Sequence, residues 1–255
     1  MAHQNPKEKT MQFTKNPFTK NSWNTPTNNI EKAGTDPQYG CINVLILDES
    51  SSMSPQSLQT KNAVNGMLKE MASDEKNKVI ISTFNGRDVR VSDLLDPTQV
   101  KLSYNPNGMT NLYDAIIETI NKVNYELSKT FSHMKPVVIF QIMTDGHENS
   151  SKNSSYTVKN LISRCEENEW TFTFVGADID PFSMARDIGI NTSAITVIDK
   201  ANYDIGFNNA TSAYNSIKTM RKMGLTNDAI YASASIWSDQ PNANPTVSVC
   251  VNDKK

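Results

Sequence analysis

Short apolar runs alternate along this chain with longer segments in which apolar residues recur every three or four positions. Residues 42–47 form the first run, and a stripe at Val64, Met67, Leu68 and Met71 follows it. Continuous apolar runs are typical of buried parallel strands, whereas a stripe with helical spacing is typical of a helix that buries one face. The pattern therefore predicts strands and helices in alternation.

Six strands are predicted, over 42–47, 79–84, 89–91, 137–145, 171–176 and 194–198. Helical stripes are found at Ile116, Ile120, Val123 and Leu127, at Val158, Leu161, Ile162 and Cys165, and at Phe207, Ala210, Tyr214 and Ile217. A further short helix is predicted from about Pro181, and Ser54 and Pro55 are predicted as the N-cap and first residue of the first helix. Asn85-Gly86 lies between two strand patterns and predicts a hairpin, so one edge strand should be antiparallel.

Repeated strand–helix units imply an α/β fold with right-handed crossovers. We expect a Rossmann-like, doubly wound and mostly parallel six-stranded sheet, with one antiparallel edge strand and helices on both faces.

The chain divides into three parts. Residues 38–224 are expected to form the folded domain, preceded by a flexible polar tail over 1–37 and followed by an extension over 225–255 that is predicted as weak strand or extended chain. The tail contains a repeat, Phe13-Thr14-Lys15-Asn16 and then 18–21, followed by Trp23. The tail is either a polar segment with incidental aromatics or a docking motif that wraps over the domain or a partner.

Composition narrows the classes of partner. The 25 basic and 27 acidic residues give a net charge of −2, which offers no electrostatic basis for binding nucleic acid or an anionic membrane. Three widely spaced cysteines form no disulfide framework, and Cys165 is predicted as a reduced core thiol. Because the first residues carry no apolar signal segment, we expect a cytoplasmic protein, and the sequence indicates no oligomeric state.

Candidate chemistry begins where the first strand ends. Asp48-Glu49-Ser50-Ser51-Ser52 alternates a carboxylate with two hydroxyls, and such a loop can direct three hard oxygen atoms at one point. Hard oxygen ligands suit Mg²⁺ or Mn²⁺ and suit zinc or copper poorly. The same residue types also cap helices and form turns, which is the alternative interpretation of this loop.

Two further motifs follow in order. Thr110 precedes a predicted helix, and Asp145 ends a second apolar strand. With the D-x-S-x-S loop, these motifs resemble the von Willebrand factor type A (vWA) domain over about residues 40–223, of the stand-alone bacterial or phage type. The resemblance implies a complete metal-ion-dependent adhesion site (MIDAS) that holds Mg²⁺ or Mn²⁺ through Asp48, Ser50, Ser52, Thr110 and Asp145.

The resemblance also implies a function. A protein partner would present an acidic side chain to an open coordination position of the ion, so that the domain is a metal-dependent binding module and not an enzyme. The rim that contacts the partner is predicted to include Met53, Met109, Asn111 and His147.

Two alternatives remain open at this point. One is a structural or assembly protein, encoded by a phage or mobile element, with a vestigial metal site. The other, less favoured, is a hydrolase or phosphotransfer enzyme. The chain has no G-x-G-x-x-G after the first strand, no Walker loop and no G-x-S-x-G elbow, and Ser50 replaces the second carboxylate of a D-x-D pair.

Overall fold

The computed structural model describes residues 40–131, 135–177, 180–199 and 202–233. The predicted tail over 1–37, with its aromatic repeat, and residues 234–255 of the predicted extension therefore lie outside the described residues. No helix within the described ranges combines the length and apolar character that crossing a membrane requires.

Within the described residues, six strands form one sheet in the order β3-β2-β1-β4-β5-β6. They are β1 (Cys41–Asp48), β2 (Lys78–Phe84), β3 (Val89–Val91), β4 (Val137–Thr144), β5 (Thr171–Ala177) and β6 (Ile195–Ile198). All neighbours pair in parallel except β2 and β3, which form the predicted hairpin at Asn85-Gly86. The predicted Rossmann-like sheet with one antiparallel edge strand is confirmed.

The order of the strands creates a switch point between β1 and β4. From β1 the chain builds outward to β2 and β3, then crosses back to place β4 on the other side of β1. Ligands of open α/β sheets bind outside the carboxyl ends of the strands at such a reversal. The carboxyl ends of β1 and β4 are therefore where a site is expected.

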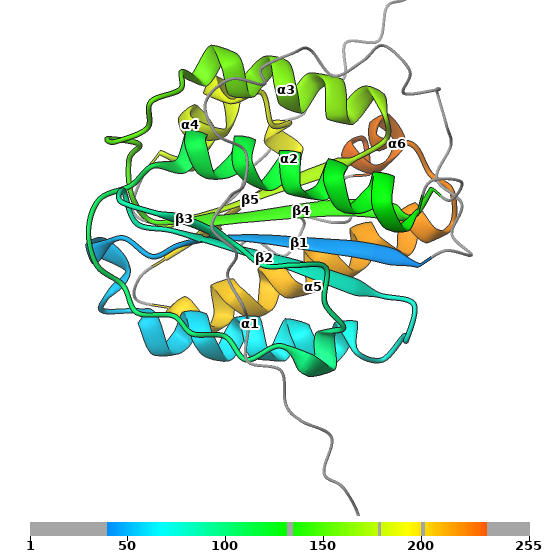
Figure 1. Ribbon diagram of the computed structural model, residues 1–255, viewed down its shortest axis with the longest axis horizontal. Coiled ribbons are helices and arrows are strands. Elements are labelled where there is room, and N and C mark those ends of the chain that lie inside the picture. The colour runs from blue at the N-terminus through cyan, green and yellow to red at the C-terminus, as the bar shows by residue number, and fades with distance from the viewer. Residues whose placement is uncertain (1–39, 132–134, 178–179, 200–201, 234–255) are drawn as a thin grey trace, which may run out of the picture.

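Helices cover both faces of the sheet (Figure 1). One face carries α2 (Leu112–Thr130), α3 (Ser155–Glu167) and α4 (Pro181–Asp187), and the other carries α1 (Ser57–Met71) and α5 (Tyr203–Lys222). Short elements complete the described chain: η2 (Ser51–Met53), η3 (Pro97–Gln99), η4 (Thr192–Ala194) and α6 (Asn227–Tyr231).

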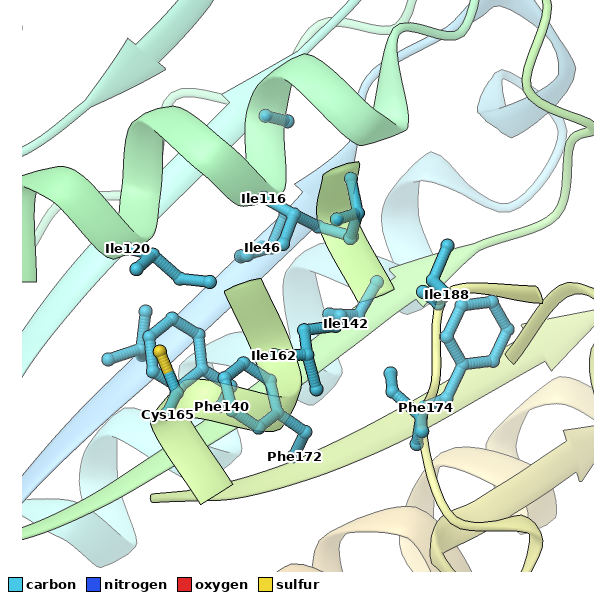
Figure 2. Close-up of a cluster of buried hydrophobic side chains, with 14 of the residues drawn as sticks. Ile46, Ile116, Ile120, Phe140, Ile142, Ile162, Cys165, Phe172, Phe174 and Ile188 are labelled. Atoms are coloured by element: carbon cyan, nitrogen blue, oxygen red, sulfur yellow. The ribbon is translucent and has the colours of Figure 1, made fainter. Parts of the chain in front are cut away.

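Alternation along β1 divides the core into two layers. Ile42, Val44 and Ile46 face the layer of α2 and α3, whereas Leu45 and Leu47 face the layer of α1 and α5. Figure 2 shows the first layer, in which isoleucines of α2 and α3 pack against phenylalanines of β4 and β5. A strand buried on both faces needs apolar residues at nearly every position, which explains the continuous runs in the sequence.

Aromatic stacking reinforces this layer. The rings of Phe140 and Phe172 stack with centroids 4.5 Å apart, and Trp170 stacks on Phe140 at 5.6 Å. Such pairs add to the free energy gained from burial alone.

Two local predictions differ from the structure. Helix α1 begins at Ser57 with Gln56 as its N-cap, because Ser51–Met53 first form a 3₁₀ turn that ends at Ser54. Residues 227–231 of the extension form helix α6 where weak strand or extended chain was expected. The Thr226 hydroxyl accepts the Ala229 N–H at 3.3 Å and so starts this helix.

Candidate metal-binding site

Asp48 ends β1, and its carboxylate is fully buried. Its Oδ1 accepts the Ser50 N–H at 2.7 Å, and its Oδ2 accepts the Thr144 hydroxyl at 2.6 Å. Burial raises the pKa of Asp48 to about 6, while the hydrogen bonds from Thr144 and Ser50 oppose that shift. The carboxylate is therefore held in one orientation in a poorly solvated place, where a cation would be an effective counter-charge.

Asp145 follows β4 directly and is 5% exposed. The Ser52 hydroxyl donates to its Oδ1 at 2.6 Å, and the Gln56 amide donates to its Oδ2. The hydroxyls of Ser50 and Ser52 lie 2.9 Å apart. The D-x-S-x-S loop and the end of β4 therefore form one connected cluster of oxygen atoms.

Thr110 approaches this cluster from the loop before α2. A Cβ added at Gly146 would lie 3.0 Å from Thr110 Oγ1, 3.4 Å from Ser52 Oγ and 3.6 Å from Asp48 Oδ2. These three oxygen atoms, two from the D-x-S-x-S loop and one from the Thr110 loop, therefore converge on the point beside Gly146 that a side chain would occupy. Oxygen atoms that converge in this way are the type of ligand that a small, hard cation prefers.

The β4–α3 loop holds Thr110 in place. Asn149 accepts the Thr110 N–H at 3.0 Å through its side chain, and the Asn149 and Ser150 N–H groups donate to the Thr110 carbonyl at 3.0 and 3.1 Å. Glu148 fixes the same loop by accepting the Ser150 N–H at 2.8 Å and the Tyr113 N–H at 3.1 Å. Glu148 is therefore one of the main supports of this loop.

The ligand chemistry differs from that of zinc centres built on histidine and cysteine. Within the described residues, no group of three or more His, Cys, Asp or Glu side chains is placed to hold an ion. The cluster instead combines two carboxylates with three neutral hydroxyls. Such a set suits hard cations such as Mg²⁺ and Mn²⁺.

A second layer of contacts fixes the D-x-S-x-S loop. The Tyr104 hydroxyl donates to the Asp48 carbonyl, and the Ser51 N–H donates to the Gly108 carbonyl at 3.1 Å. Glu49 is 1% exposed, accepts the Asn105 N–H at 2.5 Å and forms an ion pair with Arg90 of β3. The edge hairpin is thereby tied to the site.

The four predicted rim residues divide into two pairs. Met109 is 54% exposed and His147 is exposed as well, so both are accessible beside the site. Met53 is 3% exposed because it packs into the core layer of α1 and α5. Asn111 is buried as well, and its side chain accepts the Gly86 N–H at 2.7 Å. Met53 and Asn111 therefore do not belong to an exposed rim.

Gln56 and Thr144 contact the two carboxylates but were not predicted from the sequence. Thr144 directly precedes Asp145, which is a weak local signal for a role beside that residue. Gln56 carries no such signal, because its partner lies 89 positions further along the chain.

The fold is similar to that of proximal thread matrix protein 1 from the mussel byssus, with a TM-score of 0.55 at 11% identity over 70% of this chain and 48% of that chain. A structure of the mussel protein with a zinc-occupied MIDAS motif gives a TM-score of 0.51 at 14% identity, over 74% of this chain and 47% of that one. A von Willebrand factor type A protein from Catenulispora acidiphila gives a TM-score of 0.48 at 16% identity, over 68% of this chain and 42% of that chain.

These likenesses concern the fold, which is a vWA-like Rossmann fold. The chain spans less than half the length of each of these three structures. No protein-family model and no curated protein matches the chain.

Proposed function

We propose that this protein is a metal-dependent protein-binding module, which recruits a partner through a carboxylate at the carboxyl edge of the sheet. The observation that carries the proposal is the convergence of oxygen atoms of Thr110, Ser52 and Asp48 on the position beside Gly146. Asp48, Ser50, Ser52, Thr110 and Asp145 are the proposed ligands. The zinc-occupied MIDAS motif of the mussel protein supports a divalent cation at such a position in this fold.

The ligand set favours an anionic partner. Both aspartates already accept hydrogen bonds, Asp48 from Thr144 and Asp145 from Ser52 and Gln56, so part of their negative charge is compensated before a cation binds. The hydroxyl ligands are neutral. A bound Mg²⁺ or Mn²⁺ would supply the positive charge that attracts a carboxylate from the partner.

The proposal for the ion is tested by thermal unfolding in Mg²⁺ or Mn²⁺ and in chelator. At one hundred times the dissociation constant, binding adds about 2.7 kcal/mol, which raises Tm by about 5 to 11 °C for a domain of this size. Asp48→Asn and Asp145→Asn should abolish the rise. Asp88→Asn is the matched control, because Asp88 is an exposed carboxylate on the hairpin at the same edge of the sheet. Equal melting of wild type and site variants at millimolar metal would contradict the proposal.

The proposal for the partner is tested by affinity capture from native lysate in Mg²⁺. Captured proteins should be released by chelator and lost with Thr110→Val, which removes one hydroxyl ligand and keeps the shape of the buried side chain. Capture that is insensitive to both changes would mean that partners bind through another surface.

A further inference from the structure

Large apolar side chains are exposed mainly at one edge of the molecule. Eight are strongly exposed within the described residues, and five of these belong to the carboxyl edge of the sheet. We call these five the apolar collar: Leu58 (64% exposed), Met109 (54%), Tyr156 (72%), Phe182 (43%) and Ile205 (58%).

The collar lies at the same edge of the sheet as the candidate metal site. Leu58, Tyr156 and Phe182 are each the second residue of a helix, and Ile205 is the third residue of α5. All four helices begin at the carboxyl edge, the left-hand edge of the sheet in Figure 1. Met109 directly precedes the proposed ligand Thr110.

Leu58 and Ile205 lie on neighbouring first turns. Helices α1 and α5 run parallel on one face of the sheet, with Glu70 of α1 accepting a hydrogen bond from Asn215 of α5. These two residues are the fourteenth and thirteenth of their helices, so the two N-terminal turns lie at the same level. Leu58 and Ile205 are therefore at the same level of this edge, on adjacent helices.

Folding does not account for these side chains. None of the five belongs to either core layer of the described residues. First turns of helices favour polar and acidic residues, which satisfy free N–H groups and the helix dipole, so apolar residues there add nothing to helix formation. Exposed apolar groups that gather at one edge beside a polar site are typical of a protein-binding surface.

We infer that the partner's acidic residue is flanked by large apolar side chains, which cover the collar while the carboxylate faces the metal site. The inference rests on the proposed function, because the carboxylate is assigned by the cation. Charge complementarity requires an anion only at the proposed metal site, whereas the exposed aliphatic and aromatic groups at the same edge favour apolar contacts. The occupant is thus a protein segment in which Asp or Glu neighbours Leu, Ile, Phe or Trp.

The test uses short random peptides displayed on filamentous phage and the full chain in Mg²⁺, with elution by chelator. Enriched peptides should carry an acidic residue next to a large apolar one. The triple substitution Leu58→Ser, Phe182→Ser and Ile205→Ser should weaken a selected peptide about tenfold or more, equivalent to about 1.4 kcal/mol. Its Mn²⁺ affinity should equal that of wild type. Tyr125→Ser with Met223→Ser is the matched control, because both residues are exposed away from this edge.

The outcomes separate this inference from the proposed function. Chelator-released peptides that are acidic but lack apolar neighbours, or that bind the triple variant unchanged, would overturn the collar and leave the proposed function intact. Failure to select any chelator-released peptide would overturn both. Metal-dependent self-association lost in the triple variant would assign the collar to a second copy of this chain and overturn the partner inferred here.

Discussion

Gln56 offers the sharpest test of how the chain prepares this site. Its side chain is 1% exposed, and its amide nitrogen donates to Asp145 Oδ2 and to Met53 Sδ. Its Oε1 has no hydrogen-bond partner in the described part of the chain. The residue therefore keeps one buried acceptor unsatisfied while it orients Asp145.

Gln56→Leu removes both the hydrogen bond to Asp145 and the unsatisfied Oε1, and it keeps a similar side-chain volume. Loss of the hydrogen bond to the carboxylate costs about 1.5–3 kcal/mol, whereas removal of the unsatisfied acceptor relieves about 1–3 kcal/mol. The free energy of unfolding without metal should therefore change by no more than about 2 kcal/mol. Metal affinity should fall by about 10- to 100-fold, as is typical when a group that orients a metal ligand is lost.

The assay is a calorimetric titration with Mn²⁺, together with urea unfolding in chelator. Gln56→Glu is the companion variant, since it places a third carboxylate beside Asp145. Like-charge repulsion should destabilise this variant in chelator, and Mn²⁺ should restore more of its stability than it adds to wild type. Mn²⁺ affinity of Gln56→Leu within about threefold of wild type would refute an orienting role, because the expected loss is about 10- to 100-fold.

Two further predictions concern single groups. Gly146→Ala places a methyl group within 3.0–3.6 Å of three proposed ligand oxygens. Calorimetry should therefore show that the Mn²⁺ affinity is reduced about tenfold or more. Ser150→Ala, on the same loop, is the control and should leave the Mn²⁺ affinity unchanged. Burial raises the pKa of Glu166 to about 7, against a hydrogen bond from Tyr231 at 3.0 Å. Because folding raises this pKa, the folded protein favours the protonated form of Glu166. The stability that the protonated carboxyl contributes is fully present below about pH 4.5 and is lost as pH rises through about 7. Glu166→Gln should then match wild type in urea unfolding at about pH 5 and exceed it by roughly 1 kcal/mol at about pH 8, after discounting for partial exposure. An equal difference at both pH values would contradict this origin.

The sheet could be predicted from sequence because its signals are local. Each buried strand is an apolar run of sufficient length, and Asn85-Gly86 marks the hairpin through the backbone freedom of Gly86, whose φ is 79°. The proposed ligands could be found because each lies at a strand end or helix start with a recognisable motif. Helix α6 was missed because its five residues are too few for a periodic pattern.

The supports of the site could not be predicted, because they depend on which segments meet. Thr144 bonds to a carboxylate 96 positions away, and Gln56 to one 89 positions away. Met53 shows the opposite error. Its position directly after the D-x-S-x-S loop predicted a place at the exposed rim, but the 3₁₀ turn directs it into the core. These long-range contacts depend on which strands lie side by side in the sheet. Local sequence patterns do not encode the order of the strands.

The hydrogen bonds among the proposed ligands also determine how the cation and the partner depend on each other. Ser52 donates to Asp145 and lies 2.9 Å from the Ser50 hydroxyl, so a cation competes with contacts that already satisfy these groups. That competition lowers the affinity for the cation alone, while the preformed geometry avoids a large rearrangement on binding. In the proposed function, a carboxylate from the partner would add a further ligand to the cation. By linkage, the factor by which the cation strengthens partner binding equals the factor by which the partner strengthens cation binding. The proposed function therefore predicts that the Mg²⁺ affinity measured with a selected acidic peptide exceeds that of the chain alone by that same factor.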